Sequence, residues 1–308
     1  MAKPQPWYLR SFNFMKEVFA NYAEDDALTM GAALAYYTVF SFAPLLVVII
    51  SVTGFFAGQE AMSGQMFEQL NGLLGAEAAA TLQEIVKNAY ISGNSIVATV
   101  IGVGTLIFAA TGVFNALKTS LNKTWELQAS PSGAIMGFIM DRLLSFSFVI
   151  GLGFMLLVSL VVNAVVIKFV DQISQMMPAL GPTLLETVSF LIGFIVTTVI
   201  IALLFRFMPD ARARWRDIWA GAIFTSALFT LGKFAIGFYI GNSDFGSTYG
   251  AAGALITLLV WTYYSSQIIF LGAEFTFVWA KWRGYPIRPG KHAKKIIRQV
   301  KTMDAIKV

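Results

Sequence analysis

The stretch Leu184–Phe207, LLETVSFLIGFIVTTVIIALLFRF, decides the class of fold. No charged residue stands between Glu186 and Arg206. A helix of this length rises 1.5 Å per residue and is long enough to cross about 30 Å of hydrocarbon. Membrane-spanning strands are shorter and alternate in hydropathy, so the continuous run predicts a transmembrane helix rather than a strand.

Five further runs have the same character, and the composition agrees with them. The chain is 57% hydrophobic and 13% charged, with a mean hydropathy of +0.69, whereas a soluble domain carries about 25% charged residues. We therefore predict an all-α fold, a polytopic transmembrane helical bundle of about six spanning helices. The predicted spans are Gly31–Phe56, Ile96–Leu117, Leu143–Ile167, Leu184–Phe207, Ile218–Ile240 and Ala251–Trp279.

The lysine and arginine residues predict the orientation of these spans. Nineteen of the 22 lie in segments that face the cytoplasm if the N-terminus is inside. Only Lys87 and Lys168 lie in outer loops, and Lys233 lies within a span. Because positive charge accumulates on the cytoplasmic side, we expect a bacterial inner-membrane protein with both termini cytoplasmic. The net charge of +5 is then a topology signal rather than a sign of nucleic-acid binding.

Three flanking segments complete the predicted organisation. Residues 1–30 carry apolar side chains at helical spacing and predict an amphipathic helix in the inner interface. Residues 31–280 form the bundle, with an outer loop at 57–95 that predicts short helices. Residues 281–308 predict an exposed basic tail that is attracted to anionic lipid. The interfacial helix has an apolar stripe of Tyr8, Phe12, Met15, Phe19 and Tyr22, opposite Arg10, Asn13 and Lys16.

Lys233 is the most informative residue for function. It stands about 22 Å into the fifth span, at 1.5 Å per residue. A charge at membrane depth costs roughly 2.5–3.5 kcal/mol and usually faces a bundle interior or a wet cavity. Lys233 is therefore a candidate for binding an anionic group. A lysine that extends to the outer interface, or that a structural partner neutralises, is the alternative.

The sixth span holds the other candidates. Glu274 shares a helix face with Tyr263 and Gln267, and either a proton or ion relay or a structural ion pair would explain it. We expect it near the inner boundary, some 15–20 Å in depth from Lys233. The run Thr262–Gln267, which includes Tyr264, covers every face of the helix. Its members either line a substrate path or form hydrogen bonds between helices.

The first span adds a kink and more polar side chains. Pro44 cannot donate a backbone hydrogen bond and should bend the helix there. Tyr36, Tyr37 and Ser41 precede it by one to two turns. The freed backbone could form a broken-helix substrate site, or a neighbouring hydroxyl could satisfy it in a static kink. We include all four residues in the candidate substrate path.

Signals for enzymatic chemistry are weak. The chain has no cysteine, and its one histidine, His292, lies in the basic tail. No HExxH, P-loop, GxSxG or paired-carboxylate pattern occurs. Hydrolysis of a phosphodiester would need clustered metal ligands or acid and base groups. We therefore expect no catalytic residue, no metal, no cofactor and no nucleic-acid partner.

Several ordered stretches resemble a known family. Gly31–Leu46, the segment Tyr249–Leu255 with Trp261–Tyr264 and Leu271–Glu274, Leu121–Trp125, and Lys233 with Tyr239 together resemble the YihY/BrkB family of membrane proteins. The resemblance covers most of residues 15–284. It implies an inner-membrane protein with about six helices. Members have been labelled virulence factors and, formerly, ribonuclease BN, and no catalytic residue of the family carries over to a position here.

Two functional classes follow, and a third is weaker. The leading hypothesis is a transporter or lipid-handling protein for an amphiphilic or anionic small molecule, with membrane lipids as partners. The alternative is a non-transporting scaffold or envelope-integrity protein that uses residues 57–95 and its tail to bind partners. A ribonuclease is the third. The sequence leaves open whether the protein forms homo-oligomers.

Overall fold

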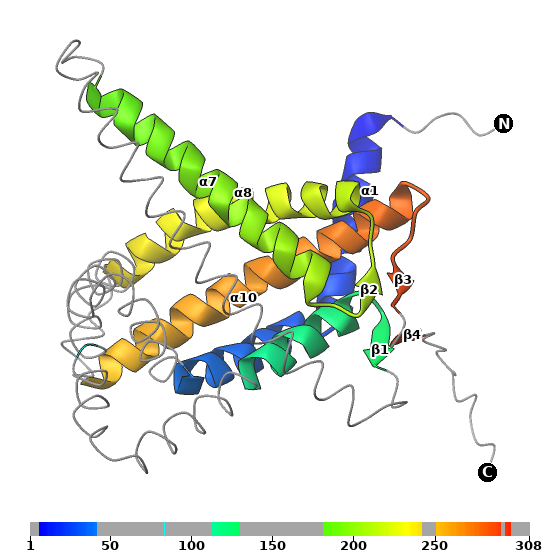
Figure 1. Ribbon diagram of the computed structural model, residues 1–308, viewed down its shortest axis with the longest axis horizontal. Coiled ribbons are helices and arrows are strands. Elements are labelled where there is room, and N and C mark those ends of the chain that lie inside the picture. Colours follow the sequence, from blue (N-terminus) through cyan, green and yellow to red (C-terminus); the bar gives the residue numbers. More distant parts are fainter. Residues whose placement is uncertain are drawn as a thin grey trace, which may run out of the picture.

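The computed structural model describes residues 6–41, 83, 112–129, 181–241, 251–290 and 293–296 (Figure 1). Helices dominate this part of the chain. Two of them carry no label in Figure 1, namely Ala27–Ser41 and 112–124. The labelled elements are α1 (Trp7–Glu24), β1 (Leu127–Ala129), α7 (Gly181–Phe207), β2 (Ala211–Arg212), α8 (Trp215–Gly241), α10 (Ala251–Trp282), β3 (Arg288–Pro289) and β4 (Ala293–Lys295).

Three helices are long and apolar enough to span a membrane. They are α7, α8 and α10, with apolar windows at Phe190–Phe207, Trp215–Ile236 and Leu255–Trp282. These windows confirm the last three predicted spans. Only 28% to 33% of each window is buried inside the protein. Because most of each apolar surface faces outward, lipid rather than a protein core must solvate it.

The other predicted spans are described only in part. The helix Ala27–Ser41 covers the beginning of the first span, and the helix 112–124 contains the end of the second. The third span, Leu143–Ile167, lies outside the described residues. So does the predicted outer loop 57–95, apart from Gln83, which is helical.

Helices α8 and α10 pack against each other in antiparallel register through small residues. A side chain at Gly221 would overlap the hydroxyl of Thr276, and one at Gly272 would overlap that of Thr225. Each threonine donates its hydroxyl to the glycine carbonyl one turn earlier on its own helix, Thr225 to Gly221 and Thr276 to Gly272. The backbones can therefore approach closely without leaving a polar group unsatisfied.

Helix α1 packs along the C-terminal half of α10. Phe14 contacts Phe275, Trp279 and Trp282 edge to face, with ring centroids 5.2–6.2 Å apart. Beside it, Glu17 accepts hydrogen bonds from Lys281 (2.7 Å) and Trp282 (2.6 Å). Burial alone would raise the pKa of Glu17, but these two donors and the charge of Lys281 hold it below its ordinary value. The carboxylate is therefore ionised at neutral pH.

The apolar stripe predicted for this helix is divided between two faces. Tyr8, Phe12 and Phe19 are exposed, as an interfacial helix requires. Tyr22 instead turns into the bundle and donates a hydrogen bond to Gln267. Phe14, which did not stand out in the sequence, packs on α10, and Val18, one turn later, is fully buried in the core. The predicted helix is confirmed, and in addition to the predicted stripe it has a second apolar face that packs on protein.

The end of the helix 112–124 is inserted between α7 and α10. Trp125 is fully buried, and its indole nitrogen donates to the carbonyl of Ala273 (3.1 Å). Its ring also meets Phe205 edge to face at 6.2 Å. Leu121, one turn earlier, is equally buried. The stretch Leu121–Trp125 is therefore a packing element that joins three helices.

Asp210, in the short connection between α7 and α8, ties three segments together. Its carboxylate pairs with Lys118 (3.1 Å) and accepts a hydrogen bond from Asn122 (3.1 Å). Its backbone N–H donates to the side chain of Asn122 (2.8 Å), and its carbonyl accepts from Gly290 (2.8 Å). The helix 112–124, the connection and the segment after α10 thus meet at one residue.

The segment after α10 contains two short strands, β3 and β4, although the sequence predicted an exposed tail for residues 281–308. Strand β3 pairs with β2, and β4 pairs with β1, both antiparallel (Figure 1). Ile287 is buried beside them. These pairs are two or three residues long, too short and too polar for hydropathy to reveal. They add to an all-α fold without changing its class.

Both ends of the described chain lie at the same end of α10. Helix α1 contacts Phe275–Trp282, and β3 and β4 follow that end directly. Figure 1 shows α1, β3 and β4 at that same end of α10. This arrangement agrees with an even number of spans, and the side of the membrane on which the termini lie remains a prediction.

We predict that Gly221→Ala destabilises the protein by about 1–3 kcal/mol, because the new methyl group overlaps Thr276 and the close-packed interface must shift. Adding Thr276→Ala removes the overlapping hydroxyl and should recover part of the loss. Thermal unfolding of the purified protein in detergent measures both effects.

Gly193→Ala is the matched control, because nothing lies within 4 Å of a side-chain carbon there. It should leave stability unchanged or raise it slightly, since alanine favours helix. Equal losses for Gly221→Ala and Gly193→Ala would contradict the proposed interlock.

Candidate binding groove between α7 and α8

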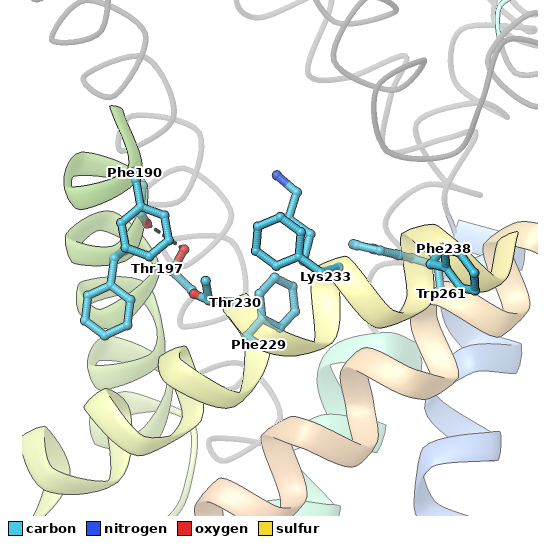
Figure 2. A pocket seen from close by; sticks show the side chains of 10 residues that line it. Phe190, Thr197, Phe229, Thr230, Lys233, Phe238 and Trp261 are labelled. Atoms are coloured by element: carbon cyan, nitrogen blue, oxygen red, sulfur yellow. Dashed lines mark hydrogen bonds between the residues drawn. The ribbon is translucent and has the colours of Figure 1, made fainter. Parts of the chain in front are cut away.

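A cavity of about 530 Å³ lies between α7 and α8, with one wall from α10. Figure 2 shows Phe190 and Thr197 on α7 facing it, together with Phe229, Thr230 and Lys233 on α8. Most of its lining is aromatic. The lining residues are Phe190, Gly193, Phe194, Thr197, Phe229, Thr230, Lys233, Phe234, Phe238 and Trp261.

Lys233 supplies the one charged side chain among these lining residues. It is exposed and extends away from the ribbon of α8 (Figure 2). It lies eighteen residues after Trp215 and eight before Gly241, so about 27 Å and 12 Å from the ends of α8. None of the ion pairs in the described part of the chain involves Lys233. Its ammonium group is therefore available to an anion from outside the protein.

The hydroxyl groups in the groove already donate to their own helices. Thr197 donates to the carbonyl of Gly193 (2.8 Å), and Thr230 donates to that of Ser226 (2.8 Å). Their oxygen atoms can still accept hydrogen bonds. The groove thus offers a cation, two weak acceptors and several aromatic faces, which suits a ligand with an anionic group attached to an apolar body.

Tyr263 and Gln267 lie on the opposite contact of α10, toward α1 and the helix Ala27–Ser41. Gln267 accepts the hydrogen bond from Tyr22, and a side chain at Gly31 would overlap it. Burial, with the nearby Tyr263 as a second cause, raises the pKa of Tyr22 to about 12, so this phenol keeps its proton. Of the two roles considered for these residues, lining a substrate path or joining helices, these contacts are of the second kind.

Two further candidates, Tyr264 and Tyr37, also lie in contacts between helices. The phenol of Tyr264 occupies the space where a side chain at Gly232 would stand. A side chain at Gly112 would likewise meet the ring of Tyr37, so this tyrosine packs on the helix 112–124. Ser41 is buried and donates to the carbonyl of Tyr37 (2.7 Å). Tyr36 is exposed and lies beside Phe40, and Pro44 lies outside the described residues.

Glu274 is buried far from the groove, with 1% of its surface exposed. In the antiparallel register, Gly232 lies opposite Tyr264, so Glu274 is ten residues, or about 15 Å, along α10 from the level of Lys233. Its neighbour Ala273 accepts the hydrogen bond from Trp125. The structure therefore keeps Glu274 and Lys233 in separate places. This separation agrees with the difference in depth that was predicted from their positions in the sequence.

The aromatic wall of the groove was not singled out from the sequence. Phe190 and Phe194 are four residues apart on α7, and Phe234 and Phe238 are four residues apart on α8. That helical spacing is the signal that could have found them. It is hard to recognise because both helices are apolar on every side.

Comparison with known proteins assigns the family. Residues 18–297 match the protein family described as "Virulence factor BrkB". The chain belongs to this family. The resemblance predicted from Gly31–Leu46, Leu121–Trp125 and the α10 segments is thereby confirmed, and no solved structure matches the chain.

Relatives in the BrkB family carry two kinds of name. The chain is 26% identical to the UPF0761 membrane protein Smlt0865 of Stenotrophomonas maltophilia (strain K279a), over 90% of its own length and 63% of the relative. It is 26% identical to the UPF0761 membrane protein PSHAa0171 of Pseudoalteromonas translucida (strain TAC 125), over 84% and 83%. It is 23% identical to the ribonuclease-like protein YfkH of Bacillus subtilis (strain 168), over 89% and 98%.

These names establish a membrane protein and no specific activity. The chain spans less than two thirds of the length of Smlt0865, so that relative holds sequence with no counterpart here. The UPF0761 names state no substrate, and the ribonuclease-like label belongs to the Bacillus subtilis relative.

We predict that Tyr22 and Gln267 are coupled in stability. Tyr22→Phe removes the hydrogen bond and should cost about 1 kcal/mol. In the background of Gln267→Leu the same change should cost far less, since the acceptor is already gone. A double-mutant cycle on thermal unfolding measures the coupling, and strictly additive losses would contradict a structural role for the pair.

Proposed function

We propose that this BrkB-family protein binds an amphiphilic compound with an anionic group and moves it within or across the membrane, using the groove between α7 and α8. The observation that carries the proposal is Lys233, an exposed cation in an aromatic cavity of about 530 Å³ inside a helix that can span a membrane. Transport itself is the inference from that geometry.

The free-energy cost of placing Lys233 within the membrane supports a bound anion at this position. Keeping an ammonium group at membrane depth costs roughly 2.5–3.5 kcal/mol. Within the described ranges no carboxylate offsets this cost by an ion pair. A phosphate or carboxylate of a bound amphiphile would offset it by a charge-assisted hydrogen bond.

The remaining surface of the groove suits the apolar part of such a compound. The volume falls in the range of roughly 300–1,000 Å³ that is usual for small-molecule sites. Phe234 and Phe238 line the groove and are also strongly exposed. Because the outer surface of a span faces lipid, these rings connect the groove to the bilayer, and an acyl chain could enter sideways.

The proposal keeps the orientation predicted from lysine and arginine, with both termini in the cytoplasm of a bacterium. Lys233 is nearer the end of α8 that is opposite to β2 and β3, so it would lie in the outer half of the membrane. A ligand that binds there would be taken from, or released to, the outer leaflet.

The test measures movement of a fluorescent anionic lipid between leaflets in vesicles that contain the purified protein. Lys233→Met should reduce the rate at least about tenfold, since it removes a charge-assisted contact, and Lys233→Arg should retain most of it. Gly193→Trp should also reduce the rate, because it fills the groove at a position where a side chain meets no other atom.

Two controls separate this function from its alternatives. Lys16→Gln removes an exposed charge outside the groove and should leave the rate unchanged. Wild-type activity in both Lys233→Met and Gly193→Trp would contradict the proposal. RNA cleavage that survives stringent purification and is lost in Lys233→Met would favour an enzyme instead, as the name of the Bacillus subtilis relative suggests.

A further inference from the structure

The pairing of β2 with β3 places two arginines side by side. In its antiparallel register Ala211 lies opposite Pro289, and Arg212 lies opposite Arg288. Directly opposed residues point to the same face of the pair, with Cβ atoms about 4.5–5.5 Å apart. Both arginines are exposed. Like charges in this position destabilise a strand pair, so the arrangement calls for an explanation.

Backbone contacts and a buried side chain, rather than the two arginine side chains, hold the two strands together. Gly290 donates its N–H to the carbonyl of Asp210 (2.8 Å). A side-chain carbon at Gly290 would stand 2.9 Å from that same oxygen, so the approach needs glycine. Ile287 is buried just before the strand. These contacts fix the two arginines next to each other in spite of their repulsion.

The nearby carboxylates are used elsewhere. Asp210 pairs with Lys118 and accepts from Asn122. Asp217 is buried and pairs with Arg283 at 3.4 Å. No ion pair among the residues that the structure describes involves Arg212 or Arg288. The two guanidinium groups therefore form a concentrated positive charge that no carboxylate in the described part of the chain neutralises.

The surroundings place this charge at a membrane surface. Residues 208–214 alone connect α7 to α8, so they must lie where two spans leave the hydrocarbon. Arg214 lies over the ring of Tyr285 at 3.8 Å, and Arg206 lies over Trp215 at 5.4 Å. Both rings are exposed. Tyrosine and tryptophan at this depth are typical of the headgroup region.

We propose that Arg212 and Arg288 bind the phosphate of an anionic lipid headgroup in the adjacent leaflet. Guanidinium groups donate pairs of parallel hydrogen bonds to phosphate oxygens, and two adjacent forks can share one phosphate. The bound negative charge relieves their repulsion, while Tyr285 and Trp215 lie beside the glycerol and upper acyl chain. The site is at the opposite end of α8 from Lys233, so it does not rest on the function proposed above.

The test compares two charge-matched double variants of the full chain. Arg212→Gln with Arg288→Gln removes the opposed pair. Lys16→Gln with Lys294→Gln removes the same charge from exposed positions outside it. Native mass spectrometry measures how much phosphatidylglycerol each protein retains against phosphatidylcholine. The arginine variant should retain on the order of tenfold less, and the lysine variant should stay within about twofold of wild type.

Thermal unfolding in nanodiscs gives a second readout that a purely structural role would not reproduce. In phosphatidylcholine alone, the arginine variant should be at least as stable as wild type, because the like-charge contact is gone. Phosphatidylglycerol should then stabilise the wild type and the lysine variant but not the arginine variant.

Three results would overturn the proposal. The first is equal loss of phosphatidylglycerol from both double variants, which would indicate general attraction to charge. The second is a lower melting temperature of the arginine variant in phosphatidylcholine, which would indicate a structural role. The third is equal stabilisation of the wild type by water-soluble glycerol phosphate, which would indicate a site for free phosphates.

Discussion

The close contact between α8 and α10 is the constraint on which the remaining structure depends. Gly221 and Gly272 let the two helices approach until Thr276 and Thr225 fill the space that a side chain would take. This contact sets the antiparallel register and also the rotation of α8 about its axis. With Gly221, Thr225 and Gly232 turned toward α10, Lys233 and Thr230 are turned toward α7 and the groove.

α10 serves as the common support of the molecule. Along one side it carries α8, and along another it carries α1 and the helix Ala27–Ser41, through Gln267 and the Phe14 cluster. Trp125 anchors the helix 112–124 to it as well. The polar run Thr262–Gln267 faces several of these partners at once, which explains why a central helix carries hydrogen-bonding side chains on every face.

Hydropathy predicted the parts of the fold that depend on solvation by lipid. Leu184–Phe207 and the two later spans are helices because backbone groups in hydrocarbon must bond within their own segment. Lys233 stood out for the same reason, since a charge is costly there. The phenylalanine residues that line the groove did not stand out in the sequence. A helix that is apolar on every side carries no periodic signal for the face that meets a cavity. The second face of α1 did not stand out either, where Phe14 and Val18 compete with a longer exposed stripe.

The contacts at the end of α10 where α1 and the short strands lie could not be predicted from the sequence, for another reason. Strands of two or three residues such as β2 and β3 have no periodicity, and their pairing joins residues far apart in the chain. Asn122 and Lys123 resembled a family signature, and only the structure assigns them to Asp210 and Asp26. The opposed Arg212 and Arg288 likewise looked like ordinary cytoplasmic charges.

An experimental density map of the purified protein in a lipid nanodisc tests the central claim most directly. We predict elongated density along Phe190, Phe234 and Phe238, ending in a headgroup within hydrogen-bonding distance of the Lys233 ammonium. A map in which a carboxylate of the chain itself pairs with Lys233, or in which protein side chains fill the groove, would contradict it.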